Sequence, residues 1–118
     1  MEHVFWLLEL EINDGAYDDF EAVMRDMIAN VEQNEPATLN YEWFISDDKK
    51  TCHIYERFEN SEATLFHLGL FGEHFAERFM SLITLKRLVL HGDPSPALHE
   101  ALSNLGAGFM GRWAAAAK

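Results

Sequence analysis

Hydrophobic and polar residues change their spacing along the chain, and each change predicts a structural element. Val4–Ile12 is rich in strand formers, and its last residues alternate between apolar and acidic, which favours a β-strand. After the turn signal at Asn13–Gly15, apolar residues from Ala16 to Val31 recur at helical spacing. Leu39–Ile45 and Thr51–Phe58 are again strand-like, and the short polar connection between them predicts a hairpin.

A helix is predicted after this hairpin. Asn60 or Ser61 is suited to cap it, and helical spacing then continues to Leu70. Gly69 and Gly72 disfavour a helix, so we expect them to break it. A second short helical segment over residues 73–82 is expected to follow.

The last third of the chain predicts one strand, one helix and a tail. Leu85–His91 reads as a strand ended by a Gly- and Pro-containing turn, and Pro96–Leu105 has helical spacing. The Gly- and Ala-rich segment from Gly106 onward is expected to be a loosely packed tail whose Phe109, Met110 and Trp113 are able to dock. We therefore predict a single domain over residues 1–105 and a C-terminal tail over 106–118.

The order of these elements predicts an α+β fold. It is the ferredoxin-like βαββαβ arrangement, an antiparallel sheet with helices on one face, followed by an extra C-terminal helix. The strands carry apolar side chains on both faces: Tyr41 and Trp43 lie on one side of their strand and Phe44 on the other. No second set of helices is available to cover the outer face. This pattern predicts a homodimer that forms through the sheet face.

Composition and charge narrow the classes of partner. The 118 residues include 48% hydrophobic ones, enough for a globular core, and the formal net charge is −11. Such an acidic chain is not expected to bind nucleic acid or an anionic membrane surface, since both require Lys and Arg. The apolar start of the chain contains Glu2, Glu9 and Glu11 and resembles neither a membrane span nor a signal peptide. We therefore expect a cytoplasmic protein.

The spacing of the cysteine and histidine residues matches no metal-binding motif. Cys52 is the single cysteine, so no internal disulfide or CxxC site is possible, and its strand-like surroundings favour a core residue. His67 and His74 are separated by seven residues and two glycines, which is not a ligand spacing. No metal site is predicted.

One stretch resembles a known family. His53–Phe79 is similar to the signature region of the antibiotic biosynthesis monooxygenase superfamily, which has the dimeric α+β barrel fold. The matching residues are Glu56 in the strand, the aromatic Phe58, the helix cap at Asn60 and Ser61, the small residue Ala63, His67, and the later pair of His74 and Phe75. The similarity of element order extends from about Phe5 to Asp93, and residues 36–94 resemble an uncharacterised bacterial subgroup.

The resemblance implies a cavity between helices and sheet that takes a small quinol-like or polyphenolic substrate. Some relatives insert oxygen without metal or flavin, so no cofactor is expected. Such chemistry needs a base near neutral pKa and donors for the developing anion. His67, His74 and Glu56 are the candidate catalytic residues. The alternative is that each histidine makes a structural hydrogen bond between helix and sheet.

Aromatic side chains are the candidate substrate contacts. Tyr41, Trp43 and Phe71 are expected to line the cavity, with Tyr41 as a donor to a substrate oxygen; packing in the core or the dimer interface is the alternative. The haem-degrading branch of the superfamily is disfavoured, because Val4–Ile12 lacks its Asn, and His67 and Glu77 stand where it has Trp and an axial His.

Two functional hypotheses follow. The first is a cofactor-independent monooxygenase or related oxidoreductase acting on a small aromatic molecule. The second is a non-catalytic small-molecule-binding or structural dimer that uses the same cavity.

Overall fold

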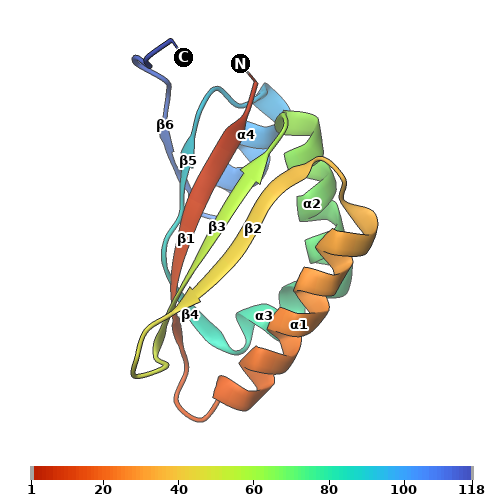
Figure 1. The fold of residues 1–118 in the computed structure, drawn as a ribbon, viewed down its shortest axis with the longest axis vertical. Coiled ribbons are helices and arrows are strands. Elements are labelled where there is room, and N and C mark those ends of the chain that lie inside the picture. Colours follow the sequence, from red (N-terminus) through yellow and green to blue (C-terminus); the bar gives the residue numbers. More distant parts are fainter. Residues whose placement is uncertain (1, 118) are drawn as a thin grey trace.

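The computed structural model describes residues 2–117 and has the predicted α+β architecture, one sheet with helices on one face (Figure 1). The elements, in chain order, are β1 (Val4–Ile12), α1 (Tyr17–Asn34), β2 (Thr38–Ile45), β3 (Thr51–Phe58), α2 (Ser61–His74), α3 (Ala76–Met80), β4 (Ile83–Arg87), β5 (Val89–His91), α4 (Pro96–Ser103) and β6 (Gly108–Met110). The ferredoxin-like fold is confirmed, and its first half follows the predicted boundaries closely.

The sheet is mixed rather than purely antiparallel. Its strands run in the order β2-β3-β1-β5-β6, with β4 also paired to β1. All pairings are antiparallel except β5 with β6, which is parallel. The expectation of an antiparallel sheet was therefore wrong at one edge. The reason is β6, which the sequence analysis assigned to the tail.

The predicted strand Leu85–His91 consists of two strands, β4 and β5. Glu9 pairs with Arg87 and Leu10 with Leu85, so Lys86 is an extra residue opposite β1. Such a bulge bends a strand locally. Leu88 falls between β4 and β5 and lines a cavity described below.

Helix α2 continues through both glycines, contrary to the prediction that they would break it. Asn60 caps the helix by accepting a hydrogen bond from the Ala63 backbone N–H at 2.8 Å, and the helix ends at His74. A glycine in a helix costs about 1 kcal/mol relative to alanine. Packing of the buried face of α2, which includes Thr64 and His67, stabilises the helix by more than the glycines destabilise it.

Part of the predicted tail is structured. Gly108–Met110 forms β6 beside β5, and the Phe109 ring stacks on His99 with centroids 3.9 Å apart. Trp113 is fully exposed and Met110 is half exposed, so of the three large side chains Phe109 alone docks. A strand of three residues is too short to show a period in the sequence, which explains why it was missed.

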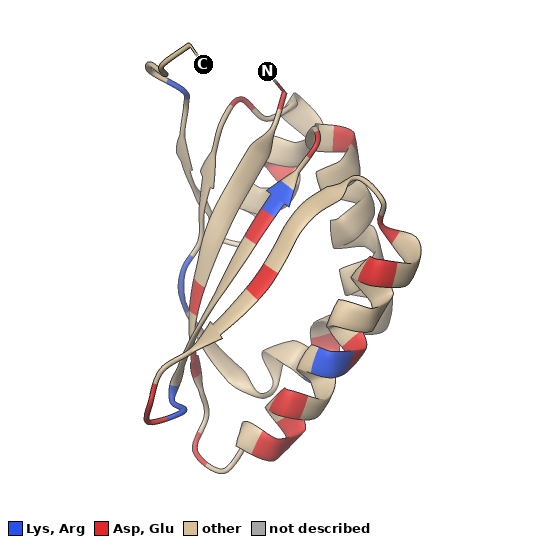
Figure 2. Cartoon of the chain, viewed as in Figure 1, with Lys and Arg blue, Asp and Glu red and all other residues tan. Residues whose placement is uncertain are grey.

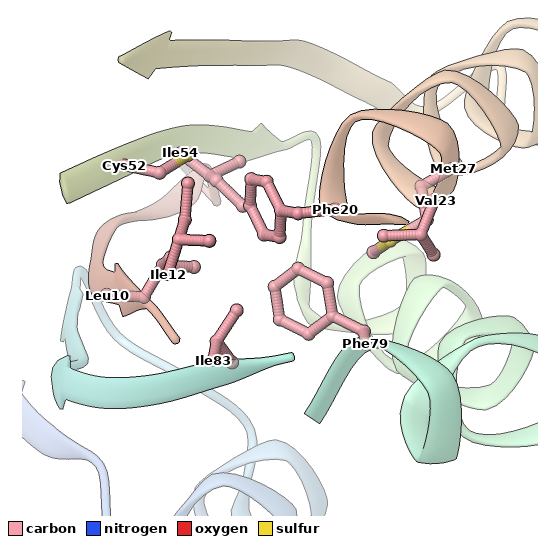
Figure 3. Packing of buried hydrophobic residues seen from close by; sticks show 9 residues of the cluster. All are labelled: Leu10, Ile12, Phe20, Val23, Met27, Cys52, Ile54, Phe79 and Ile83. Carbon is pink, nitrogen blue, oxygen red and sulfur yellow. The ribbon is translucent and has the colours of Figure 1, made fainter. Parts of the chain in front are cut away.

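Two hydrophobic clusters form the core between sheet and helices. The first joins α1 and α3 to the sheet, and Figure 3 shows the rings of Phe20 and Phe79 next to each other, beside Ile12 and Ile54. The second lies under α4 and contains Val4, Trp6, Phe58, Leu90, Leu98 and Leu102. Cys52 is buried in the first cluster as expected, and burial raises the pKa of its thiol to about 12.

Acidic residues are distributed over α1, the strands and the loops of the side shown in Figure 2. None of the helices within residues 2–117 combines the length and apolar composition needed to cross a membrane.

Candidate functional site

A buried cluster of one histidine and two carboxylates connects three elements. His67, in the middle of α2, places Nδ1 2.7 Å from Oε1 of Glu35, which follows α1. On its other side, His67 Nε2 lies 3.0 Å from Oε1 of Glu56 on β3. All three side chains are nearly inaccessible to solvent, with exposures of 6% for His67, 3% for Glu35 and 4% for Glu56.

Glu35 is held by neighbours on both sides of the α1–β2 connection. Its Oε2 accepts from Asn30 Nδ2 at 2.9 Å, and its Oε1 accepts from Thr38 Oγ1 at 2.9 Å as well as from His67. Burial alone raises the pKa of Glu35, but these hydrogen bonds and the charge of His67 outweigh it, so the pKa is lowered. Glu35 is therefore a fully paired carboxylate.

Glu56 is paired less completely. Its Oε2 accepts a hydrogen bond from the indole Nε1 of Trp6 at 2.6 Å, across the β1–β3 pairing. Its Oε1 is close to His67 but makes no well-aligned hydrogen bond there or elsewhere in residues 2–117. The contact is thus an ion pair that leaves a buried oxygen able to accept from a further donor.

His67 is positively charged at neutral pH in this arrangement. Burial by itself lowers the pKa of the imidazole, but the hydrogen bond to Glu35 and the contact with Glu56 outweigh it and raise the pKa to about 9. A charged imidazole has no lone pair, so it cannot accept a proton.

Tyr41 lies beside this cluster as a neutral hydrogen-bond donor. Its ring meets His67 edge-on, with centroids 5.6 Å apart. Burial raises the pKa of the Tyr41 hydroxyl well above its ordinary value, and the negative charges of Glu56 and Glu35 add to the effect. The hydroxyl therefore keeps its proton.

Two residues of the cluster, Glu56 and His67, line a cavity of about 180 Å³ between the two hydrophobic clusters. Its polar lining comes from the residues just described, and the rest is apolar. The lining residues are Trp6, Leu8, Met27, Tyr41, Ile54, Glu56, His67, Leu68, Phe71, Ala76, Phe79, Met80, Leu85, Leu88, Leu102 and Leu105. Within residues 2–117 no group of three or more His, Cys, Asp or Glu side chains is arranged to hold a metal ion.

The structure brings together four of the six predicted site residues. Glu56, His67, Tyr41 and Phe71 all line the cavity. His74 does not: its side chain is 52% exposed at the end of α2, where it contacts Glu73. Trp43 packs against Tyr41 but lines a smaller pocket between α1 and β2, and its buried Nε1 has no partner within residues 2–117.

Sequence reasoning missed Glu35 and the role of Trp6. A glutamate followed by Pro36 after a helix is typical of an exposed connection, and only the return of the chain onto α2 buries it. Its hydrogen-bond partner, His67, lies 32 residues further along the same chain. The available signal for Trp6 was its alternation with Val4 and Leu8, which places it on the inner face of β1.

Comparison with known proteins identifies the family. The model of the family "Antibiotic biosynthesis monooxygenase" matches residues 4–81, about two thirds of the chain. The chain therefore belongs to the antibiotic biosynthesis monooxygenase family, as the resemblance in the His53–Phe79 stretch implied. No curated protein sequence matches the chain at a significant level.

Solved structures share the fold at low sequence identity. MupZ from Pseudomonas fluorescens superimposes with a TM-score of 0.86 and 20% identity, over 100% of this chain and 96% of MupZ. SnoaB from Streptomyces nogalater, described as a cofactor-independent oxygenase, superimposes with a TM-score of 0.64 and 16% identity, over 80% of this chain and 96% of SnoaB. At these identities the likeness concerns the fold.

Proposed function

We propose that this protein is a cofactor-independent monooxygenase that oxidises a small quinol in the cavity beside Glu56. The observation that carries the proposal is Oε1 of Glu56, a buried carboxylate oxygen that lies 3.0 Å from His67 Nε2 without a well-aligned hydrogen bond, in a mostly apolar cavity. Buried polar groups without a partner in a protein require an explanation, and a substrate hydroxyl is a suitable donor. The family and the cofactor-independent oxygenase SnoaB among its structural relatives support the reaction class.

The size of the cavity favours a single ring. A cavity of about 150 Å³ lined by apolar side chains holds benzene, and the cavity here is about 180 Å³. A quinol ring fits against Phe71 with one hydroxyl directed to Glu56, whereas a fused polycyclic phenol exceeds this space. We expect Tyr41, which lines the same cavity and keeps its proton, to donate to an oxygen of the bound ring.

In the proposed first step, Glu56 rather than His67 takes the proton. His67 is already protonated at neutral pH, so the available acceptor is Glu56 Oε1. Transfer of the hydroxyl proton makes Glu56 neutral and the substrate anionic, while the charges of His67 and Glu35 stay unchanged. The negative charge thus moves onto the ring next to the His67 imidazolium, where it is stabilised electrostatically.

The overall oxidation balances with molecular oxygen as the co-substrate. One ring C–H becomes C–OH and the quinol becomes a quinone, so the substrate gives up four electrons. Molecular oxygen accepts these four electrons; one of its atoms enters the ring and the other leaves as water. For hydroquinone, the simplest quinol, one molecule of quinol and one of oxygen give one hydroxybenzoquinone and one water, and no external reductant is required.

A dimer through the outer sheet face is part of the proposal. This face carries Phe5, Tyr55 and Arg57, where Arg57 Nε donates to Tyr55 Oη at 2.8 Å and the guanidinium lies 4.5 Å from the Phe5 ring centroid. Leu7, on the same face of β1, is 39% exposed in the isolated chain. An apolar and aromatic sheet face of this kind supports self-association.

Oxygen uptake tests the function directly. We expect hydroquinone or methylhydroquinone to be oxidised without added metal or flavin, above the rate of a protein-free blank at pH 7. Glu56→Gln should lower kcat by ~10²–10⁴-fold, because an amide cannot take the proton. Glu73→Gln is the matched control, since Glu73 is an exposed side chain at the end of α2 and should retain full activity. Absence of uptake above the blank over a panel of quinols would contradict the proposal.

The second candidate function is a binding protein that uses the same cavity without catalysis. It is favoured by the pairing of His67 with two carboxylates, which fits a purely structural ion pair between α1, α2 and β3. Tight binding of quinols with no oxygen uptake would select this function over the first.

A further inference from the structure

The C-terminal part of the chain adds a wall to the cavity. The family match ends at residue 81, and SnoaB covers 80% of the chain, whereas MupZ covers all of it. Helix α4 lies beyond the family match, yet Leu102 in α4 and Leu105 just after it both line the cavity. The shape of the cavity therefore depends on residues outside the common core of the family.

This wall is firmly anchored. Ser95 caps α4 by accepting from the Leu98 backbone N–H at 3.2 Å, and its own backbone N–H donates to Ser61 Oγ at the start of α2, at 2.9 Å. Leu98 and Leu102 are completely buried. Beyond α4 the chain is fixed to the sheet by the pairing of β6 with β5. The α4 segment is thus a fixed part of the cavity.

Two residues of the cavity lining, one at the end of α3 and one just after α4, are exposed to solvent. Of the residues that line the cavity, only Met80 and Leu105 are exposed, with exposed fractions of 45% and 49%. Met80 is the last residue of α3, and Leu105 follows α4. The cavity is therefore expected to open to solvent between these two apolar side chains.

The polar groups of the cavity lining form one connected set. The polar groups are those of the cluster at Glu56 and His67, with Tyr41 and Trp6 beside it. Six leucines provide much of the remaining surface: Leu8, Leu68, Leu85, Leu88, Leu102 and Leu105. A leucine-rich surface that leads to an apolar opening suits an alkyl chain better than a second polar group.

We propose that the C-terminal extension makes the cavity select a ring with one hydroxylated end and an unbranched apolar substituent, which leaves through the opening between Met80 and Leu105. The inference rests on the proposed function for the position of the hydroxyl, but the path of the substituent depends on the leucine lining alone. Leu105 and Met80 are then residues that determine ligand length.

Calorimetric titration with phenol and with 4-ethyl-, 4-butyl- and 4-hexylphenol tests this inference. Affinity should rise about fourfold for each added methylene as long as the substituent stays in contact with the apolar wall. Leu105→Trp should narrow the opening and weaken 4-hexylphenol binding by about tenfold or more, with phenol changed by less than about twofold. Met80→Trp, on the opposite side, should act in the same way.

Leu39→Trp is the matched control. Leu39 is a similarly exposed leucine, at 43%, on β2, and it does not line the cavity. It should leave the whole series unchanged. The inference is overturned if affinity does not rise with substituent length, or if neither Leu105→Trp nor Met80→Trp affects the long members more than phenol.

Alkylbenzenes of the same lengths separate this inference from the proposed function. One outcome is that Leu105→Trp weakens the binding of long alkylbenzenes as much as that of long alkylphenols, and that the hydroxyl adds no affinity. This outcome would support the opening and contradict the role of Glu56 in the proposed function. If phenols bind more tightly than alkylbenzenes but without dependence on Leu105, the proposed function is supported and the inference about the opening is overturned.

Discussion

His67 Nδ1 lies 2.7 Å from Glu35 Oε1, and this contact ties the end of α1 to the middle of α2. The same ring contacts Glu56 on β3, so a single imidazolium is shared by two helices and the sheet. Neither carboxylate is accessible to solvent. Removing the central charge would therefore leave two buried carboxylates without their counter-charge.

His67→Gln should be strongly destabilising. Breaking a buried ion pair by removal of one partner costs about 3–5 kcal/mol, because the remaining charge stays buried without compensation. Chemical denaturation at pH 6 measures this loss. The double variant Glu35→Gln/His67→Gln should recover part of it, since one of the two carboxylates is then neutral. A loss below about 1 kcal/mol in the single variant would show that the cluster contributes little to stability.

Stability should fall as the pH rises from 6.5 to above 9. The pKa of His67 is raised from 6.5 to about 9 in the folded state, so its contribution is complete below pH 6.5 and is lost as the pH rises through 9. The shift corresponds to about 3 kcal/mol. The lowered pKa of Glu35 acts at the other end: its contribution is present above pH 4.5 and is lost as the pH falls through the folded value. Urea denaturation across this range measures both, and His67→Gln should lack the alkaline loss.

Gly69→Ala and Gly72→Ala should each stabilise the protein by about 0.5–1 kcal/mol. Both glycines lie within α2, and a Cβ at either position meets no atom within 4 Å. Gly92→Ala is the contrasting variant: its φ is +116°, and a Cβ there would lie 2.9 Å from the His3 carbonyl oxygen, so it should destabilise. Thermal melts rank the three variants. Destabilisation by both helix substitutions would indicate that the exposed side of α2 is covered in the assembled protein.

Leu7→Asp should convert the proposed dimer to a monomer without loss of fold. Leu7 lies on the outer face of β1, where a carboxylate would be buried in a sheet-to-sheet contact. Phe66→Asp is the control, because Phe66 is 54% exposed on α2, on the helical side of the sheet. Light scattering at micromolar concentration measures the mass. A monomeric mass for the unchanged chain would contradict the dimer.

The sequence predicted most of the fold and two of the three residues of the ion cluster. Alternation and helical spacing located β1, α1 and the β2–β3 hairpin, since these depend on the short-range pattern alone. The motif resemblance selected Glu56 and His67. Glu35 was missed because nothing near it in the sequence signals burial; its environment is created by α2, 32 residues later. The charge of His67 was missed for the same reason. A single carboxylate, Glu56, was expected to orient the imidazole, whereas the two carboxylates present keep it protonated.

The most direct test of this account is the protonation state of His67. The proposed mechanism requires an imidazole that is already charged at neutral pH, so that Glu56 is the proton acceptor. Nitrogen-15 NMR of the imidazole side chains, with the His67 signals assigned by their loss in His67→Gln, gives this state from pH 5 to 10. We predict two protonated ring nitrogens at pH 7 and a midpoint near 9. A neutral ring at pH 7, with a midpoint at or below 6.5, would contradict it and make His67 the available base.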